Sequence, residues 1–296
     1  MKVLVFGRRG QLGSALANIS PKSYNTKFLT KSDIDLVDFS GLRDVVLSAK
    51  PAIVINAAAY TAVDRAESEA DIAFKINAEA PGIMASACEE IGAVFMHFST
   101  DYVFDGDARS PYGESAPTNP LGIYGRSKLA GEKAIGMATE RYVILRTAWL
   151  FSSVSPNFLK TMLWLAEREK EIRVVSDQIG SPTYAYDLAA AAWMIADSLR
   201  ESDNNNFGLY HAVNSGVTSW HKFATAIFEL VGRTDIVVHP ISTEEYPTSA
   251  PRPRFTALSC RLMHKNFGIA LPDWRDAASR CLKQLRYENQ RDFSPS

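Results

Sequence analysis

VLVFGRRGQLG, residues 3–13, decides the fold. Four apolar residues that end at a glycine are typical of a strand buried on both faces of a sheet. The three glycines allow a tight turn and let the backbone approach a pyrophosphate, and the start of the following helix offers unpaired N–H groups to an anion. The stretch predicts a dinucleotide-binding turn formed by Gly7, Arg8, Arg9, Gly10, Gln11, Leu12 and Gly13.

Strand-like and helix-like patterns alternate through the rest of the first half. Apolar runs recur at residues 52–55, 94–98 and 142–145, and a weaker one at 27–30 falls where a second strand is needed. Helical spacing is found at residues 12–19, 42–49, 64–91 and 124–135. This alternation predicts an α/β fold of the Rossmann type, with a doubly wound parallel sheet.

The second half has a different pattern, and we expect it to form a smaller lobe. Helices are expected near residues 157–168, 187–199, 220–230 and 274–285, between short strands and proline-rich loops. We assign 1–150 to an NAD(P)-binding Rossmann domain, to which later segments return, and 151–296 mainly to a C-terminal α/β substrate-binding lobe. A cleft is expected above the carboxyl ends of the strands. A polar surface turn is expected at 203–206 and a frayed end at 292–296.

The composition excludes several classes of partner. Lys and Arg number 32 against 33 Asp and Glu, without any block of like charge, so the basic surface of a nucleic-acid-binding protein is missing. The apolar run at residues 3–6 is too short for a signal-peptide core or a membrane span. Cys88, Cys260 and Cys281 are odd in number and far apart, which favours reduced thiols. The sequence predicts a cytoplasmic protein with no nucleic-acid or membrane partner.

A tyrosine and a lysine four residues apart, Tyr124 and Lys128, begin another predicted helix. This spacing puts the phenol and the ammonium on one helical face, where the cation is expected to lower the pKa of Tyr124. Thr100 stands at the end of the preceding strand, where it can hydrogen-bond a carbonyl that Tyr124 protonates. Asp101 and Tyr102 would project into the same crevice. The combination with the glycine turn favours a catalytic pair over a chance surface pair.

The residues after the second strand bear on the choice of cofactor. An acidic side chain there would bind the adenosine ribose and exclude a 2′-phosphate, but Thr30, Lys31 and Ser32 stand at this position. Arg8 and Arg9 add guanidinium groups, which suit phosphate geometry. NADPH is favoured and NADH is the alternative, although each basic side chain taken singly is equally explained as a solvated surface residue.

Several longer motifs resemble one known family. They include NAAAYTAVD at 56–64, STDYVF at 99–104, YGRSKLAGEK at 124–133 and RTAW at 146–149, with shorter matches at 6–13, 38–40, 119–121, 177–183 and 252–253. Along nearly its whole length the chain resembles the bacterial dTDP-4-dehydrorhamnose reductases, which are extended short-chain dehydrogenases. In these enzymes the G-x-x-G-x-x-G spacing of the first turn is familiar.

The resemblance implies roles for individual residues. Thr100, Tyr124 and Lys128 match the catalytic triad, and Asn77 resembles the asparagine that completes the proton relay of short-chain dehydrogenases. Cofactor contacts are implied for Asp38, Phe39, Ala58, Ala59, Tyr60 and Asn77, in addition to Lys31, Tyr124, Lys128 and the glycine turn. Nucleotide-sugar contacts are predicted for Thr100, Asp101, Tyr102, Trp149, Gln178 and Arg252. The implied reaction is NADPH-dependent reduction of the C4 keto group of dTDP-4-dehydro-L-rhamnose.

The sequence departs from the family pattern in two respects. Some members bind Mg²⁺ at a dimer interface through a glutamate of the first helix and a late acidic pair, where this sequence has Ala15 and Tyr186-Asp187. One carboxylate is a poor Mg²⁺ site. We therefore predict no metal, and a monomer or weak homodimer in place of a metal-linked dimer. Ser259 replaces the Asp or Asn that relatives carry after the Arg-Pro loop, with a consequence that the sequence leaves open.

Two other functions remain open at this stage. The same machinery could reduce another nucleotide-linked 4-keto sugar. The NADP-binding regulatory subunit of methionine adenosyltransferase has a similar catalytic helix and an Arg-Pro-Arg stretch like Arg252 to Arg254, but Thr100 and Trp149 favour the reductase. The five histidines show no metal-ligand spacing, and His97, inside an apolar strand, is expected to be a core residue.

Overall fold

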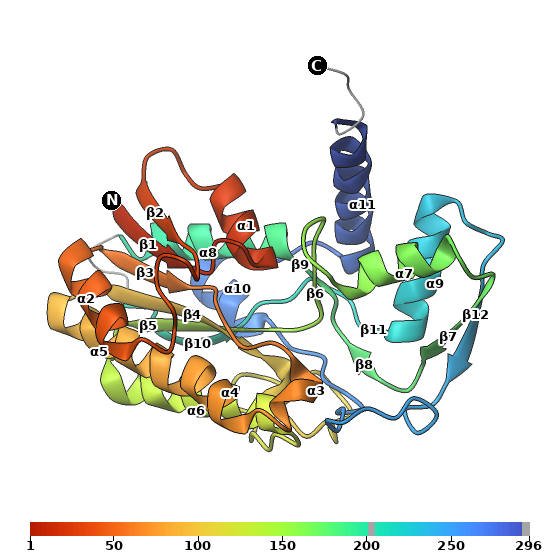
Figure 1. The fold of residues 1–296 in the computed structure, drawn as a ribbon, viewed down its shortest axis with the longest axis horizontal. Helices are drawn as coiled ribbons and strands as arrows, with labels where there is room; N and C mark the ends of the chain where they lie inside the picture. The colour runs from red at the N-terminus through yellow and green to blue at the C-terminus, as the bar shows by residue number, and fades with distance from the viewer. Residues whose placement is uncertain (201–204, 292–296) are drawn as a thin grey trace.

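A computed structural model of the protein describes residues 1–200 and 205–291. The polar turn expected at 203–206 lies partly, and the end at 292–296 wholly, outside these residues. A parallel sheet of six strands in the order β10-β5-β4-β3-β1-β2 forms the centre (Figure 1). Its strands are β1 (Lys2–Phe6), β2 (Asn25–Leu29), β3 (Ile53–Asn56), β4 (Val94–Thr100), β5 (Tyr142–Thr147) and β10 (Gly208–His211). The predicted Rossmann-type fold is confirmed.

The strand order places a switch point between β1 and β3. The chain passes from β1 to β2 on one side and then crosses to β3 on the other, so the loops after β1 and β3 diverge from neighbouring strand ends. In open α/β sheets ligands bind at such a point, outside the carboxyl ends of the strands. The glycine turn and the 57–62 loop therefore meet where a cofactor is expected.

Helices cover both faces of the sheet (Figure 1). One face carries α1 (Gln11–Asn18), α8 (Ala185–Ser198) and α10 (Arg261–Phe267), and the other carries α2 (Phe39–Ala49), α5 (Ala80–Ile91) and α6 (Ile123–Ala138). Alternate residues of β1 pack into different cores: Val3 and Val5 face α1 and α8, and Leu4 and Phe6 face α2 and α5. Apolar burial on both faces explains why the strand sequences are continuous apolar runs.

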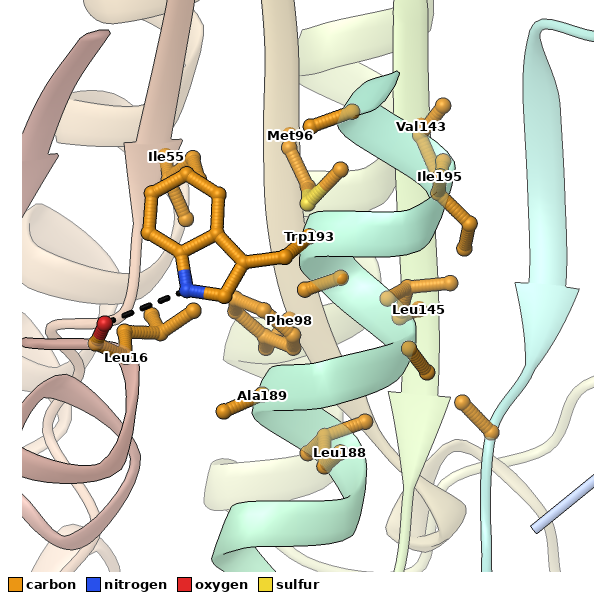
Figure 2. Packing of buried hydrophobic residues seen from close by; sticks show 14 of the residues in the cluster. Leu16, Ile55, Met96, Phe98, Val143, Leu145, Leu188, Ala189, Trp193 and Ile195 are labelled. Atoms are coloured by element: carbon orange, nitrogen blue, oxygen red, sulfur yellow. Dashed lines mark hydrogen bonds between the residues drawn. The ribbon is translucent and has the colours of Figure 1, made fainter. Parts of the chain in front are cut away.

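Trp193 links two helices on the first face. Its indole N–H donates to the carbonyl oxygen of Leu16 at 3.1 Å, and its ring packs in the cluster that includes Met96 and Phe98 (Figure 2). A buried indole needs such a partner because an unpaired N–H is costly in an apolar core. Helix α8, from the second half of the chain, is thereby fixed against α1 beside the glycine turn.

Most elements of the second half of the chain form the smaller part of the molecule, on the right of Figure 1. Helices α7 (Phe158–Ala166), α9 (Trp220–Val231) and α11 (Trp274–Arg291) share a second core, which includes Phe151, Tyr184 and Phe223. The short strands there are β6 (Leu150–Phe151), β7 (Glu171–Val175), β8 (Ile179–Gly180), β9 (Thr183–Tyr184), β11 (Thr218–Ser219) and β12 (Val237–Ile241). Within the described residues, none of the helices has the length and apolar character needed to cross a bilayer.

The single helix predicted for residues 64–91 is wrong. The segment contains α3 (Val63–Ala66), α4 (Ala70–Phe74), a π-helical turn η1 (Lys75–Glu79) and α5. Glu69 leaves the helical conformation (φ −117°, ψ 41°), and its carboxylate accepts hydrogen bonds from Tyr60 and Arg65. Pro81 has no N–H to give to the carbonyl of Asn77, so the α-helical ladder cannot continue through that residue. Helix α10 was not predicted, because seven residues are too few for a clear period.

Candidate active site

The glycine turn is shaped by two close approaches. Gly7 has a φ of +91°, and a Cβ there would lie 2.7 Å from the backbone nitrogen of Ala58. A Cβ on Gly13 would lie 2.0 Å from the carbonyl oxygen of Gly7. Only glycine fits either position, since the first needs the left-handed region and the second lets α1 pack directly on the turn. The backbone of β1, α1 and the 57–62 loop is thereby brought together.

The N-terminus of α1 has the features of an anion site. Gly10 is its N-cap and supplies no side-chain hydrogen bond, and the first turn contains no acidic residue. The side chain of Gln11 is turned toward the start of the second half, where its Oε1 accepts from Ser152 at 2.8 Å. The first N–H groups of this helix remain suited to a phosphate, which fits the pyrophosphate of a dinucleotide.

A cavity of about 870 Å³ extends from this turn across the strand ends. It is large enough for a cofactor and part of a substrate. The predicted site residues that line it are Gly7, Arg9, Gly10, Gln11, Leu12, Lys31, Ala58, Ala59, Tyr60, Thr100, Asp101, Tyr124, Lys128 and Trp149. The predicted site residues outside its lining are Arg8, Gly13, Asp38, Phe39, Asn77, Tyr102, Gln178 and Arg252.

Tyr124 and Thr100 share one wall of the cavity. Burial raises the pKa of Tyr124 to about 12, while a hydrogen bond with Thr100 acts in the lowering direction. The hydroxyl of Thr100 also donates to Asp101 at 3.1 Å and accepts from the N–H of Tyr102 at 3.2 Å. Tyr124 is therefore protonated at neutral pH, which is the form that a proton donor needs.

Lys128 does not act on Tyr124 as the sequence suggested. Its Nζ donates to the carbonyl oxygen of Phe98 at 2.6 Å and lies 3.0 Å from Nε2 of His97. Burial lowers the pKa of Lys128 to about 8. The expected lowering of the Tyr124 pKa is absent because desolvation outweighs the other influences on the phenol.

Asn77 and Asp38 have structural partners. The Asn77 side chain accepts from the N–H of Tyr60 at 2.9 Å and donates to the Tyr60 carbonyl and to Ser127, so it holds the loop beside the cavity. Asp38 caps α2 by accepting from the N–H of Gly41 at 3.0 Å. Phe39 packs against the core under that helix. Asn77 and Asp38 thus fix backbone through hydrogen bonds, and Phe39 contributes apolar packing.

The predicted substrate residues divide into two groups. Asp101 is buried in the cavity wall, and burial raises its pKa to about 6. Arg252 lies outside the lining, where it is paired with Asp64 at 2.7 Å and faces the ring of Tyr102. Gln178, also outside, donates to Thr243 at 3.1 Å. The loop carrying Arg252 is thus attached to the segment that follows the 57–62 loop.

Trp149 has a strained backbone and a stacked ring. Its φ is +48°, which is rare for a large side chain. The centroids of its ring and that of Trp220 lie 3.6 Å apart, with an angle of 8° between the ring planes. Conformations of this kind persist where the surroundings enforce them, often at ligand sites. Trp220 was missed from the sequence, because nothing in its spacing connects it with Trp149.

Two further residues of the site were missed. His97 is a core residue, as the sequence predicted, but its contact with Lys128 was missed. Glu67 accepts from the N–H of Ile123 at 2.8 Å and so caps the helix that carries Tyr124 and Lys128. The sequence signal for Glu67 was weak: Gly122, the N-cap residue of α6, has no side chain to do this itself.

Asp187, which the resemblance aligns with the metal site of some relatives, is already paired. Arg280 donates to both carboxylate oxygens of Asp187 at 2.7 Å, and Asn214 donates to one of them at the same distance. Among the described residues, no three His, Cys, Asp or Glu side chains gather in a way that could hold a metal ion. The prediction that no metal is bound remains a prediction.

The fold and this set of side chains define a Rossmann-type oxidoreductase of the extended short-chain dehydrogenase class. The chain belongs to the family described as the RmlD substrate binding domain, whose model matches residues 1–287. It is 42% identical over 295 residues to a dTDP-4-dehydrorhamnose reductase of Burkholderia thailandensis, covering 96% of this chain and 99% of the relative. The family resemblance inferred from the sequence is confirmed.

Two solved structures of that family are close in shape. A dTDP-4-dehydrorhamnose reductase from Clostridium acetobutylicum gives a TM-score of 0.91 at 36% identity, over 97% of this chain and 100% of that one. One from Bacillus anthracis, in complex with NADP, gives 0.90 at 37% identity, over 96% and 99%. The similarity therefore includes both the sheet and the smaller C-terminal part.

Proposed function

We propose that this protein reduces the C4 keto group of dTDP-4-dehydro-L-rhamnose to give dTDP-L-rhamnose, with NADPH as the reductant. The observation that carries the proposal is that Thr100, Tyr124 and Lys128 line the same cavity as the glycine turn. Membership of the family and full-length relatives named as this reductase support the choice of substrate.

The side chains divide the work of a carbonyl reduction. The reduced nicotinamide supplies the hydride that goes to the carbonyl carbon. The Thr100 hydroxyl turns its proton from Asp101 to the carbonyl oxygen and holds that oxygen by a hydrogen bond. Tyr124 gives its phenolic proton to the same oxygen, so the ketone becomes an alcohol. The catalytic contribution of the protein is orientation and electrostatic stabilisation of the charge that develops on oxygen. Lys128, which lines the same cavity, adds a positive charge there when it is protonated.

The two ends of the cavity suit the two ligands. Backbone N–H groups of α1 would hold the pyrophosphate, with Arg9 and Lys31 at the end where an adenosine 2′-phosphate would lie. Asp101 and Trp149 would contact the nucleotide sugar, together with residues of 151–296 as the substrate-binding lobe. We place the reaction in the cytoplasm, as the reduced cysteines and NADPH use suggest.

The first experiment follows NADPH oxidation by its absorbance, with dTDP-4-dehydro-L-rhamnose generated in situ by the upstream enzymes. Rapid oxidation with formation of dTDP-L-rhamnose is the expected result. Tight NADPH binding without turnover of this sugar would overturn the substrate assignment, and other nucleotide-linked 4-keto sugars would then be assayed in the same way. If this protein turned over no such sugar but pulled down a methionine adenosyltransferase, the regulatory-subunit alternative would be favoured.

A further inference from the structure

His97 connects the catalytic lysine to the neighbouring strand. It lies in β4 and is 1% exposed; its Nε2 is 3.0 Å from Nζ of Lys128, and its Nδ1 is 3.2 Å from Nδ2 of Asn56. Burial, and then the charge of Lys128, hold the pKa of His97 well below its ordinary value, so the ring is neutral and carries one proton. A neutral imidazole donates at one nitrogen and accepts at the other, so its two partners must have complementary roles.

Asn56 decides which ring nitrogen accepts. Its Oδ1 already accepts from the N–H of Ala58 at 3.1 Å, so the group facing His97 is the Nδ2 donor. Nδ1 of His97 then accepts, and the ring proton lies on Nε2, facing Lys128. A neutral lysine amine can accept that proton with its lone pair while donating to the Phe98 carbonyl. With a neutral amine, every hydrogen bond in the series from Ala58 to Phe98 therefore pairs one donor with one acceptor.

A protonated Lys128 has the opposite requirement. An ammonium can only donate, so Nε2 of His97 must accept and the ring proton must lie on Nδ1. Two donors then meet, either at His97 and Asn56 or, if the Asn56 amide turns over, at Asn56 and the N–H of Ala58. A buried donor without a partner is costly, so the charge on Lys128 disturbs a hydrogen bond beside the 57–62 loop.

We propose that His97 is a positioning residue for Lys128, and that its ring exchanges tautomers when Lys128 gains or loses its proton. The exchange couples that proton to Ala58, in the loop that lines the cavity. Of the other titratable groups, Glu132 on the same helix acts on Lys128, and Tyr124 and Asp101 line the same cavity. Glu132 is held by two hydrogen bonds from Arg146 of β5, at 2.6 and 2.8 Å, and its charge favours the ammonium form.

The first test needs no substrate and stands apart from the proposed function. Long-range proton–nitrogen NMR correlations report which ring nitrogen of His97 carries the proton. Between pH 6 and about 10, we expect the proton to move from Nδ1 to Nε2, near the pKa of about 8 of Lys128. In Lys128→Met it should stay on Nε2 at every pH. One tautomer throughout the titration of the wild-type protein would overturn the proposal.

The same spectra contain an internal control. His211 is also buried, and its Nδ1 lies 3.1 Å from the carbonyl oxygen of Tyr112, which can only accept. Burial lowers its pKa to about 3. Its ring should keep the proton on Nδ1 over the whole range and in both proteins, because its partner does not titrate.

A pair of substitutions provides the kinetic test, which rests on the proposed function. In His97→Gln the amide oxygen reaches the place of Nε2. It accepts from the Lys128 ammonium without placing a donor against Asn56, because no ring proton has to move. The alkaline limb of kcat/KM should then move up by about one pH unit, with kcat within about threefold. His97→Asn reaches only the place of Nδ1, leaves Lys128 without this partner, and should lower kcat at least about tenfold.

Two controls separate a positioning role from a merely structural one. If His97 positions Lys128, His97→Gln and His97→Asn should lose similar unfolding free energy in urea although their kcat values differ. His211→Asn should leave kcat unchanged. Equal kcat losses in His97→Gln and His97→Asn, or an unshifted alkaline limb in the glutamine variant, would overturn the positioning role. If the wild-type protein does not turn over the sugar, the proposed function fails, and the NMR titration alone decides the role of His97.

Discussion

Arg8 and Arg9 are neighbours in the sequence with different surroundings. Arg9 lines the cavity, whereas Arg8 donates to Ser14 at 3.4 Å and packs over the ring of Phe28. If the Arg9 guanidinium binds the 2′-phosphate, Arg9→Ala should raise KM for NADPH about tenfold and leave KM for NADH within about twofold. Arg8→Ala is the matched control and should change neither. Steady-state kinetics with both cofactors measures this, and an equal effect on the two cofactors would refute the assignment.

Tyr124 is predicted to matter for proton transfer and little for binding. In Tyr124→Phe the ring and its edge-to-face contact with Tyr102 remain, but no phenolic proton is available. kcat should fall at least about 100-fold, because a positioned acid commonly contributes this much. The dissociation constant of NADPH, measured by fluorescence, should change little. Turnover near the wild-type rate would mean that another group protonates the oxygen.

How far the sequence predicts the site depends on how local each relation is. Tyr124 and Lys128 are joined by helical spacing, and Thr100 by the rule that strand ends meet, so their shared cavity could be predicted. The contact of His97 with Asn56 depends on the register of β3 and β4, which pairs these two residues. Register between non-adjacent segments leaves no mark in a single sequence. For the same reason Trp220 beside Trp149 could not be foreseen.

Helix α6 is capped by a residue from another element. Glu67 accepts from the N–H of Ile123, next to Tyr124, since Gly122 offers no side chain for the purpose. Glu67→Ala should lower the unfolding free energy by about 1 kcal/mol. It should also lower kcat while changing KM less, because the first turn of α6 carries the proton donor Tyr124. Glu67→Gln keeps an acceptor oxygen and should restore most of both. Urea unfolding and steady-state kinetics test this; equal defects in the two variants would exclude capping as the cause.

Elements with a strong period were predicted and interruptions were not. The buried strands and α1, α2 and α6 are regular, so periodicity places them within a few residues. The segment 64–91 was assigned one helix because its alanines fit a helical period. The break at Glu69 comes with a tertiary partner, Tyr60, whereas the one at Asn77 follows from Pro81, which has no N–H for the Asn77 carbonyl. Local propensity yields to such contacts when they satisfy buried polar groups.

At the scale of the whole molecule, the ion pair between α8 and α11 bears on assembly. Asp187 is 8% exposed, and Arg280 and Asn214 occupy its carboxylate. The position corresponding to the glutamate of the metal-linked relatives is Ala15, which is buried. A divalent ion would have to displace a bidentate guanidinium and would still find one carboxylate, too few for Mg²⁺.

The mass of the protein in solution should therefore not respond to Mg²⁺. Sedimentation velocity is expected to give the same sedimentation coefficient in excess Mg²⁺ and in EDTA. The turnover rate is also expected to be the same in both. Arg280→Gln releases the Asp187 carboxylate and should also be unresponsive, because Ala15 supplies no second ligand. A heavier species that forms only with Mg²⁺ in the wild-type protein would show that ligands from elsewhere complete a metal site. If Arg280→Gln alone gained a Mg²⁺-dependent dimer, the guanidinium would be the group that excludes the ion, and the missing glutamate would be of little consequence.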